Sequence, residues 1–223
     1  MILLIDAGNT RIKWAWLTSR MPAATHAAVY DPHLAWQSSM RNSGSKPDRI
    51  LASNVRGARF AAELSSFTQH AFGVTPEYPH AQAKQLGVTN GYQEPTRLGI
   101  DRWLGLIAAR HEDLRPSLLV GSGTALTIDA LTGQGQHLGG LIAPGMRILT
   151  ALQASDPSTA IVSLIRRALA ALQAYDPPTT PRLVLAGGDA RALAPYFDAT
   201  AELREDLVLS GLAQLALSAT KPA

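Results

Sequence analysis

The stretch Leu3–Gly8, which reads LLIDAG, is an apolar run that ends in a turn of small residues. A second β-prone segment, 11–17, follows this turn directly. The same pattern returns 115 residues later, where Leu118–Gly123, LLVGSG, precedes the β-prone segment 125–131. A chance match between two apolar strands is the alternative explanation. Because the copies lie half a chain apart, we instead predict a duplicated α/β domain.

The predicted boundary between the halves lies near residue 114, so the halves are 1–114 and 115–223. Hydrophobic periodicity places the other elements. Strands are expected at 2–6, 11–17, 49–53, 117–121, 125–131, 139–144 and 182–186. Helices are expected near 57–70, 101–113, 145–154, 160–174 and 204–219. The polar or proline-rich stretches 38–48 and 175–182 are predicted to be surface loops.

Composition narrows the class of protein. The chain has 223 residues, of which 46% are hydrophobic and 17% charged, which is enough apolar material for a core. It contains no cysteine, which removes disulfides and thiol nucleophiles and fits a reducing cytosol. No segment approaches the ~20 apolar residues of a membrane span. The net charge of +3 is not gathered into a basic run. We therefore expect a cytoplasmic protein that binds neither membranes nor nucleic acid.

Common nucleotide-binding motifs are absent from the sequence. None of the lysines follows a glycine, so there is no Walker A loop. Gly121-Ser-Gly123 lacks the third glycine of a dinucleotide fingerprint, and a β-prone segment rather than a helix follows it. A Gly-x-Ser-x-Gly nucleophile elbow is also missing. Phosphate binding, if present, must therefore use the duplicated glycine turns.

A glycine turn between strands can aim successive backbone N–H groups at a phosphate. In the first turn, Asp6 is placed to hold Mg²⁺ through water, since Mg²⁺ retains much of its hydration shell. Asn9 and Thr10 can donate to phosphate oxygens, and Lys13 can supply a point charge. The alternative is a plain hairpin with a solvated lysine. A second glycine turn, Gly121–Thr124, occurs at the spacing of the duplication. The presence of two such turns favours phosphate binding at both turns over a plain hairpin.

Two further segments carry polar residues at element ends. Gly187-Gly188 follows a predicted strand and would let an adenine or ribose lie against the backbone, or would form an ordinary turn with Asp189 as a helix N-cap. Asp101 stands beside Arg102 at the start of a predicted helix. It is either an N-cap or first-turn aspartate interacting with the helix dipole, or a base that accepts the proton of an alcohol.

If Asp101 is the base, Arg102 can bind an anionic group of the same substrate in bidentate fashion, and Tyr92 can add a hydrogen bond to that substrate. The residues alone leave both readings open. The six histidines show no metal-binding spacing and are interpreted as surface or structural residues.

In combination, these motifs resemble the type III pantothenate kinases. The matching stretches follow the family's order: Asp6-x-Gly8-Asn9-Thr10-x-x-Lys13, Gly91-Tyr92, Gly99-Ile100-Asp101-Arg102, Gly123-Thr124-Ala125-x-Thr127-x-Asp129, Gly139-Gly140-x-Ile142-x-Pro144-Gly145 and Gly187-Gly188. The resemblance implies an actin-like ATPase fold, in which two ribonuclease-H-like halves flank a cleft. It also implies a homodimer that uses Mg²⁺ and ATP to phosphorylate pantothenate, the first step of coenzyme A biosynthesis.

The resemblance also implies residue roles. Asp101 is the proton acceptor, and Asp129 supports the metal or the loop. The ATP-binding positions are Asp6, Ala7, Gly8, Asn9, Thr10, Arg11, Lys13 and Thr124, and the pantothenate-binding positions are Tyr92, Gly99, Ile100, Asp101 and Arg102.

Two departures from the family pattern bear on these roles. The family's aspartate for a monovalent cation, K⁺ or NH₄⁺, is replaced here by Gly121. The chain is also shortened around 155–160, where relatives carry a threonine that contacts pantothenate and of which Thr159 is a candidate remnant. Two other functions therefore stay open beside the kinase: a non-catalytic ATP-binding regulator similar to transcriptional activators, and a kinase for another small alcohol.

Overall fold

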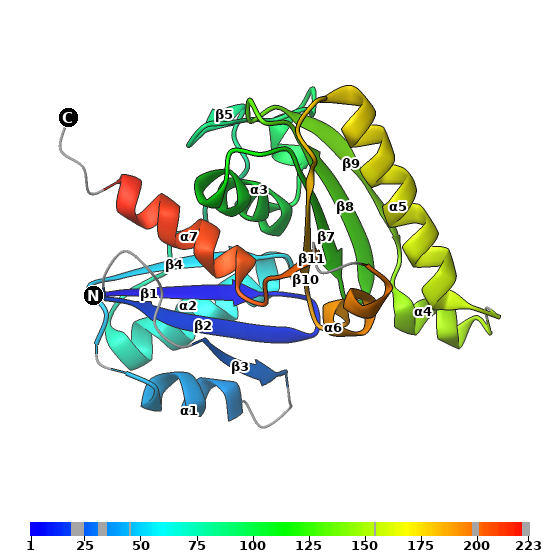
Figure 1. Ribbon diagram of the computed structural model, residues 1–223. Helices are drawn as coiled ribbons and strands as arrows, with labels where there is room; N and C mark the ends of the chain where they lie inside the picture. Colours follow the sequence, from blue (N-terminus) through cyan, green and yellow to red (C-terminus); the bar gives the residue numbers. More distant parts are fainter. Residues whose placement is uncertain (19–24, 31–34, 45, 154, 198–200, 220–223) are drawn as a thin grey trace. The chain divides into compact units, whose positions relative to one another are not determined.

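The computed structural model describes residues 1–18, 25–30, 35–44, 46–153, 155–197 and 201–219 (Figure 1). Their contacts form two compact units. The first comprises Met1–Ala81, Gly99–Leu104 and Val208–Ala223, and the second comprises Gln82–Leu98 and Gly105–Leu207. These units follow contacts rather than chain order. The boundary of the duplication near residue 114 stays a prediction.

The sheet of the first unit has the strand order β3-β2-β1-β4. Strands β1 (Ile2–Ala7), β2 (Arg11–Leu17) and β3 (His26–Val29) form an antiparallel meander. Strand β4 (Arg49–Asn54) pairs with β1 in parallel, on the side away from β2. The LLIDAG stretch thus forms a central strand, which explains its run of buried apolar residues.

Helices α1 (Ala35–Asn42) and α2 (Ala58–Phe72) pack with the sheet in one hydrophobic cluster of the first unit. Helix α1 corrects the prediction that 38–48 is entirely a loop. Trp36 and Met40, one helical turn apart, are both buried in this core, so the segment is held by its apolar face despite its polar composition. The Ser43 hydroxyl accepts hydrogen bonds from the indoles of Trp14, at 2.8 Å, and Trp16, at 3.2 Å.

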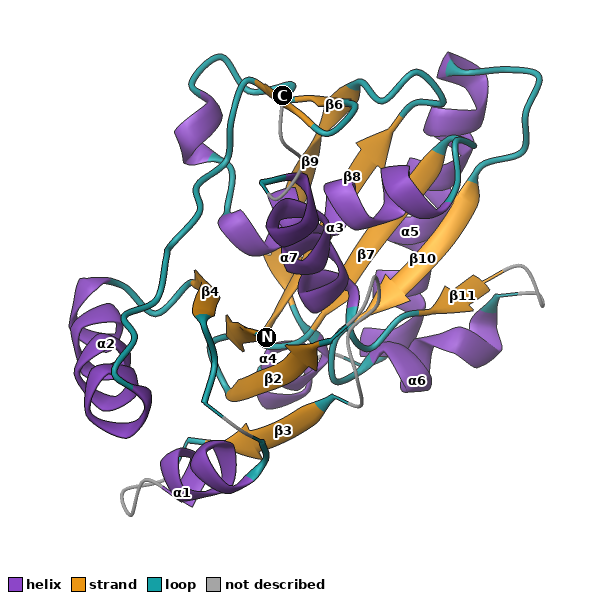
Figure 2. Ribbon diagram, turned by 90° about the vertical axis from the view of Figure 1, so that its left-hand side faces the viewer, coloured by secondary structure: helices purple, strands orange, loops and turns teal. Residues whose placement is uncertain are grey.

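The sheet of the second unit repeats the first arrangement (Figure 2). Its strand order is β11-β10-β7-β8-β9. Strands β7 (Ser117–Ser122), β8 (Ala125–Leu131) and β9 (His137–Pro144) form an antiparallel meander, and β10 (Arg182–Ala186) runs parallel to β7. Strand β11 (Ala201–Leu203) adds an edge. The shared topology of β1–β4 and β7–β10 confirms the duplicated fold.

The other predicted helices are also present. They are α3 (Ile100–Glu112), α4 (Met146–Ala151), α5 (Pro157–Tyr175) and α7 (Leu207–Ser218), with the short α6 (Ala190–Leu193) after β10. Two 3₁₀ turns, Pro95–Arg97 and Ala194–Tyr196, and a small hairpin of β5 (Lys84–Gln85) and β6 (Val88–Thr89) complete the elements. Asp156 caps α5 by accepting the Thr159 N–H at 2.9 Å. Within the described ranges, no helix has the length and apolarity needed to cross a membrane.

Candidate active site

The first unit places Asp6 among three chemically distinct neighbours. The strand register sets it opposite Lys13 on β2 and beside Ser53 on β4. Burial raises the pKa of the Asp6 carboxyl to about 7, although part of the residue remains accessible. Lys13 and the Ser53 hydroxyl oppose this shift, whereas the Asp101 carboxylate adds to it. Asp6 and Asp101, 95 residues apart in sequence, are therefore close enough to interact electrostatically.

Ser53 is a neighbour of Asp6 that sequence reasoning missed. Its side chain is fully buried, and over the described part of the chain its hydroxyl makes no hydrogen bond of regular geometry. It lowers the pKa of the Asp6 carboxyl, so the hydroxyl faces that group. Only the parallel pairing of β1 with β4 brings the two residues together.

Asp101 lies in the first turn of α3, after the residue that caps the helix. The Trp103 N–H donates to the Gly99 carbonyl at 3.0 Å, which starts the helix at Ile100. A Cβ at Gly99 would lie 2.7 Å from Asp101 Oδ1 and 3.8 Å from Arg102 Cδ. The Asp101 carboxylate therefore folds back over Gly99, and a side chain at that position would displace it. Gly99, Asp101 and Arg102 form one local group in the same unit as Asp6.

The first glycine turn, residues 8–10, joins β1 to β2 and exposes Asn9, Thr10 and Arg11. Arg56, which the sequence did not single out, supports this turn. Its Nη1 donates to the Asn9 carbonyl at 2.6 Å, and its guanidinium lies 3.8 Å from the centre of the Tyr30 ring. No motif could have revealed this contact, because Arg56 and Asn9 are 47 residues apart.

In the second unit, three glycine segments meet at the turn between β7 and β8. A Cβ on Gly187 would lie 2.3 Å from the Ser122 carbonyl oxygen, and one on Gly145 would lie 2.0 Å from the Gly123 carbonyl oxygen. The Asp189 N–H donates to the Ser122 carbonyl at 3.1 Å. The predicted phosphate turn and the predicted adenosine-side glycines are therefore packed together, as close backbone approach requires.

Gly121 is covered by a neighbouring side chain. It pairs with Thr127 across β7 and β8, and a Cβ at Gly121 would lie 2.5 Å from Thr127 Oγ1. A neutral hydroxyl thus occupies the space into which a side chain at position 121 would begin to extend. No formal negative charge is supplied at this position.

Tyr92 belongs to the second unit and lies against a buried histidine. Its ring stacks on that of His137, with centres 5.9 Å apart and planes 18° apart. The carboxylate of Asp129 is 2.9 Å from His137 Nε2. This pairing gives Asp129 a partner that its motif did not predict. Over the described ranges, no three histidine, aspartate or glutamate side chains gather as a metal site.

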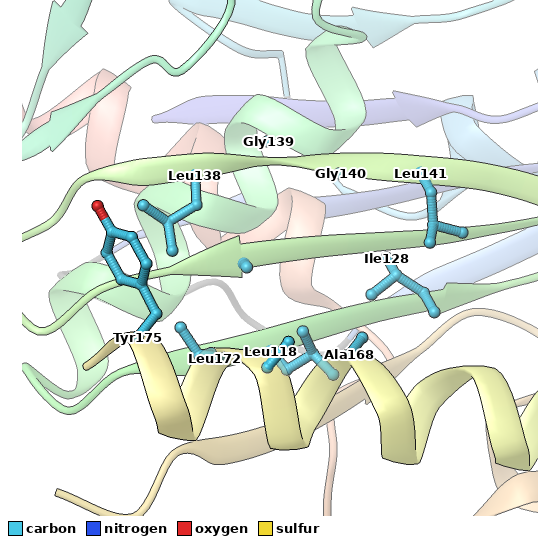
Figure 3. Close-up of a pocket in the computed structure, with 11 residues that line it drawn as sticks. Leu118, Ile128, Leu138, Gly139, Gly140, Leu141, Ala168, Leu172 and Tyr175 are labelled. Atoms are coloured by element: carbon cyan, nitrogen blue, oxygen red, sulfur yellow. The ribbon is translucent and has the colours of Figure 1, made fainter. Parts of the chain in front are cut away.

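A cavity of about 330 Å³ in the second unit is unsuited to a nucleotide (Figure 3). It lies between α5, which contributes Ala168, Leu172 and Tyr175, and the sheet, which contributes residues such as Ile128 and Leu138. Its lining contains no charged side chain. Phosphate groups require donors or cations, so this hollow is distinct from the candidate active site.

Two sheets with the same topology, each carrying a glycine turn after its first strand, define a duplicated ribonuclease-H-like fold of the actin-like ATPase class. Solved structures support this class. The chain is similar to a conserved putative Baf family transcriptional activator from Campylobacter jejuni, with a TM-score of 0.60 and 19% identity, covering 97% of this chain and 98% of that one. It is also similar to an inorganic polyphosphate/ATP-glucomannokinase from Arthrobacter sp. strain KM, with a TM-score of 0.51, 12% identity and the same coverage. These likenesses concern the fold alone.

Sequence similarity identifies the family. The sequence model of the type III pantothenate kinases matches residues 2–170. A type III pantothenate kinase from Laribacter hongkongensis (strain HLHK9) is 37% identical over 241 residues, which cover 97% of this chain and 98% of that protein. The chain therefore belongs to the type III pantothenate kinase family, and the resemblance drawn from its motifs is confirmed.

Proposed function

We propose that the protein transfers the γ-phosphoryl group of ATP to the hydroxyl group of pantothenate, giving 4′-phosphopantothenate, the first step of coenzyme A biosynthesis. Membership of the family supports the reaction. Phosphoryl transfer needs one carboxylate for the nucleotide's metal and another for the acceptor. The proximity of Asp6 and Asp101 is the observation that supports assigning the reaction to these two residues.

The residues around Asp6 fit Mg²⁺. Mg²⁺ takes oxygen ligands and is usually held by one or two carboxylates together with substrate phosphates. Asp6 supplies a desolvated carboxylate, and Asn9 and Thr10 lie exposed on the adjoining turn. When bound with ATP, Mg²⁺ neutralises phosphate charge. We propose that the nucleotide is held by Ala7 and Gly8, by Arg11 and Lys13 of β2, and by Thr124 of the second turn.

Asp101 is proposed to accept the proton of the pantothenate hydroxyl as its oxygen forms a bond to the γ-phosphorus. The bond from that phosphorus to the β–γ bridging oxygen breaks, and ADP leaves. Arg102, whose guanidinium can bind a carboxylate in bidentate fashion, is proposed to hold the pantothenate carboxylate. Gly99, Ile100 and Tyr92 complete the proposed acceptor-binding set. The main contributions are then positioning and charge stabilisation.

The test of this function is ATP turnover with and without pantothenate. We expect ADP to form stoichiometrically with 4′-phosphopantothenate and only when pantothenate is present. Turnover with another small alcohol but not with pantothenate would support the rival kinase. ATP binding without turnover on any alcohol would support the non-catalytic regulator.

The proposal also includes a cytoplasmic homodimer, as the family resemblance implies. Sedimentation analysis of the purified protein tests the dimer.

Monovalent cations are expected to have little effect on this enzyme. Weakly bound K⁺ or NH₄⁺ is attracted mainly by a carboxylate, and Gly121 with the covering Thr127 hydroxyl offers only neutral oxygens. We expect equal turnover in sodium and potassium buffers of the same ionic strength. Gly121→Asp, in which Thr127 must rotate away, should acquire activation by K⁺. A strong, saturable potassium requirement in the unmodified protein would contradict this prediction.

A further inference from the structure

The pair formed by Asp129 and His137 lies inside the second unit and carries no role in the proposed chemistry. His137 is fully buried and Asp129 is 3% exposed. The strand register pairs His137 with Leu131, two residues from Asp129, so both side chains lie on the same face of the β8–β9 hairpin. Ile128 and Leu138 lie on the opposite face and line the cavity under α5.

The hydrogen bonds of the pair define the orientation of the imidazole ring. Asp129 Oδ1 lies 2.9 Å from His137 Nε2, so a carboxylate there accepts the Nε2–H. The other ring nitrogen, Nδ1, then acts as an acceptor, and the Gly91 N–H points to it at 3.5 Å. The buried carboxylate therefore determines which ring nitrogen faces the Gly91-Tyr92 segment.

The Gly91-Tyr92 segment is fitted closely to both the backbone and the ring of His137. A Cβ at Gly91 would lie 2.2 Å from the His137 carbonyl oxygen, so only glycine allows the approach. The Thr89 N–H donates to the Gly135 carbonyl at 2.9 Å and thereby anchors the start of the segment. Tyr92 then places its ring nearly parallel to the His137 ring, and its N–H donates to Asn90 Oδ1 at 3.0 Å.

We propose that Asp129 and His137 are positioning residues for the acceptor substrate: the carboxylate orients the imidazole, and the imidazole holds Tyr92 in the place from which it contacts pantothenate. This inference rests on the proposed role of Tyr92 in pantothenate binding. It assigns Asp129 to the acceptor side of the reaction rather than to the metal. A pair that served only the stability of the hairpin would not affect one substrate selectively.

The experiment compares His137→Gln, Tyr92→Ala and the double variant. Glutamine retains an N–H donor for Asp129, so the buried carboxylate stays bonded, but it removes the ring on which Tyr92 stacks. We expect His137→Gln to raise the KM for pantothenate by roughly 3–30-fold, which lies within the range of coupling found for residues in direct contact. The KM for ATP should stay unchanged. The exposed His70 on α2 provides a matched control, since His70→Gln should change neither constant.

The double variant separates positioning from a structural role. If His137 acts through Tyr92, adding His137→Gln to Tyr92→Ala should raise the pantothenate KM no further. Effects that multiply, or an equal rise in the KM for ATP, would overturn the inference. If His137→Gln does not fold, Asp129→Asn, which keeps the size of the side chain, replaces it in the comparison of single and double variants with Tyr92→Ala. Folding is judged by the thermal shift that ATP produces.

The two proposals fail in different ways. A normal pantothenate KM in Tyr92→Ala alone would contradict the assignment of Tyr92 in the proposed function, and the positioning role with it. A raised KM in Tyr92→Ala with normal constants in both His137→Gln and Asp129→Asn would overturn the positioning role only.

Discussion

Replacing Asp101 with asparagine is expected to lower turnover by about 10²–10⁴-fold, the usual contribution of a general base, while ATP binding stays nearly intact. Asparagine retains the shape of the side chain and its place over Gly99, but it cannot accept the proton of the attacking hydroxyl. The measurement is kcat for pantothenate phosphorylation together with the dissociation constant of ATP. Near-normal turnover would show that Asp101 is only a first-turn residue of α3.

Gly99→Ala tests the position of this carboxylate rather than its chemistry. Asp101 Oδ1 occupies space only 2.7 Å from the position of the new Cβ, so the carboxylate must move. We expect turnover to fall in Gly99→Ala as well, although the base is still present. Gly57→Ala is a less suitable comparison because Gly57 has a φ of +84°, where a side chain introduces strain of its own. An exposed substitution such as His70→Gln is the better control.

Asp6→Asn is expected to reduce activity by on the order of 10³-fold, chiefly through the loss of metal-bound ATP. The amide keeps the shape of the carboxyl group but removes the charge that attracts Mg²⁺. The KM for ATP should rise, or ATP binding should be lost, while Arg102→Ala should mainly raise the KM for pantothenate. Arg102 is largely buried, so the thermal shift produced by ATP must first show that the variant folds. Equal effects of both substitutions on both substrates would mean that the two groups are assigned to the wrong ligands.

Although Asp6→Asn should lower activity, it should raise the stability of the folded protein at high pH. Because the pKa of the Asp6 carboxyl is raised from 3.8 to about 7, the folded state binds its proton more tightly than the unfolded state does. The stability that this proton provides is present at low pH and is lost as the pH rises through about 7. In the absence of metal, Asp6→Asn should therefore match the unmodified protein near pH 4 and exceed it in thermal midpoint at pH 8. A variant that is less stable at pH 8 would contradict the desolvation of Asp6.

Sequence patterns were sufficient to predict the duplicated fold and to identify the residues that lie at the ends of its central strands. The apolar runs of β1 and β7 are continuous because central strands are buried on both faces, and each run stops where a glycine turn begins. These signals are local, so they are readable without contacts. Helix α1 was missed because its polar composition concealed the turn-spaced pair of Trp36 and Met40, and the Phe60 and Phe67 rings of α2 that Trp36 contacts lie far along the chain.

The partners of the site residues were decided by tertiary structure. Ser53 faces Asp6 through the parallel pairing of β4 with β1, and Arg56 reaches the Asn9 carbonyl across 47 residues of chain. Thr127 covers Gly121, and His137 meets Asp129, through the registers of β8 with its neighbours. A motif specifies which groups a loop presents, because those groups are consecutive. Strand register and side-chain packing specify which group faces which, because a shift of one residue turns a side chain to the opposite face of the sheet.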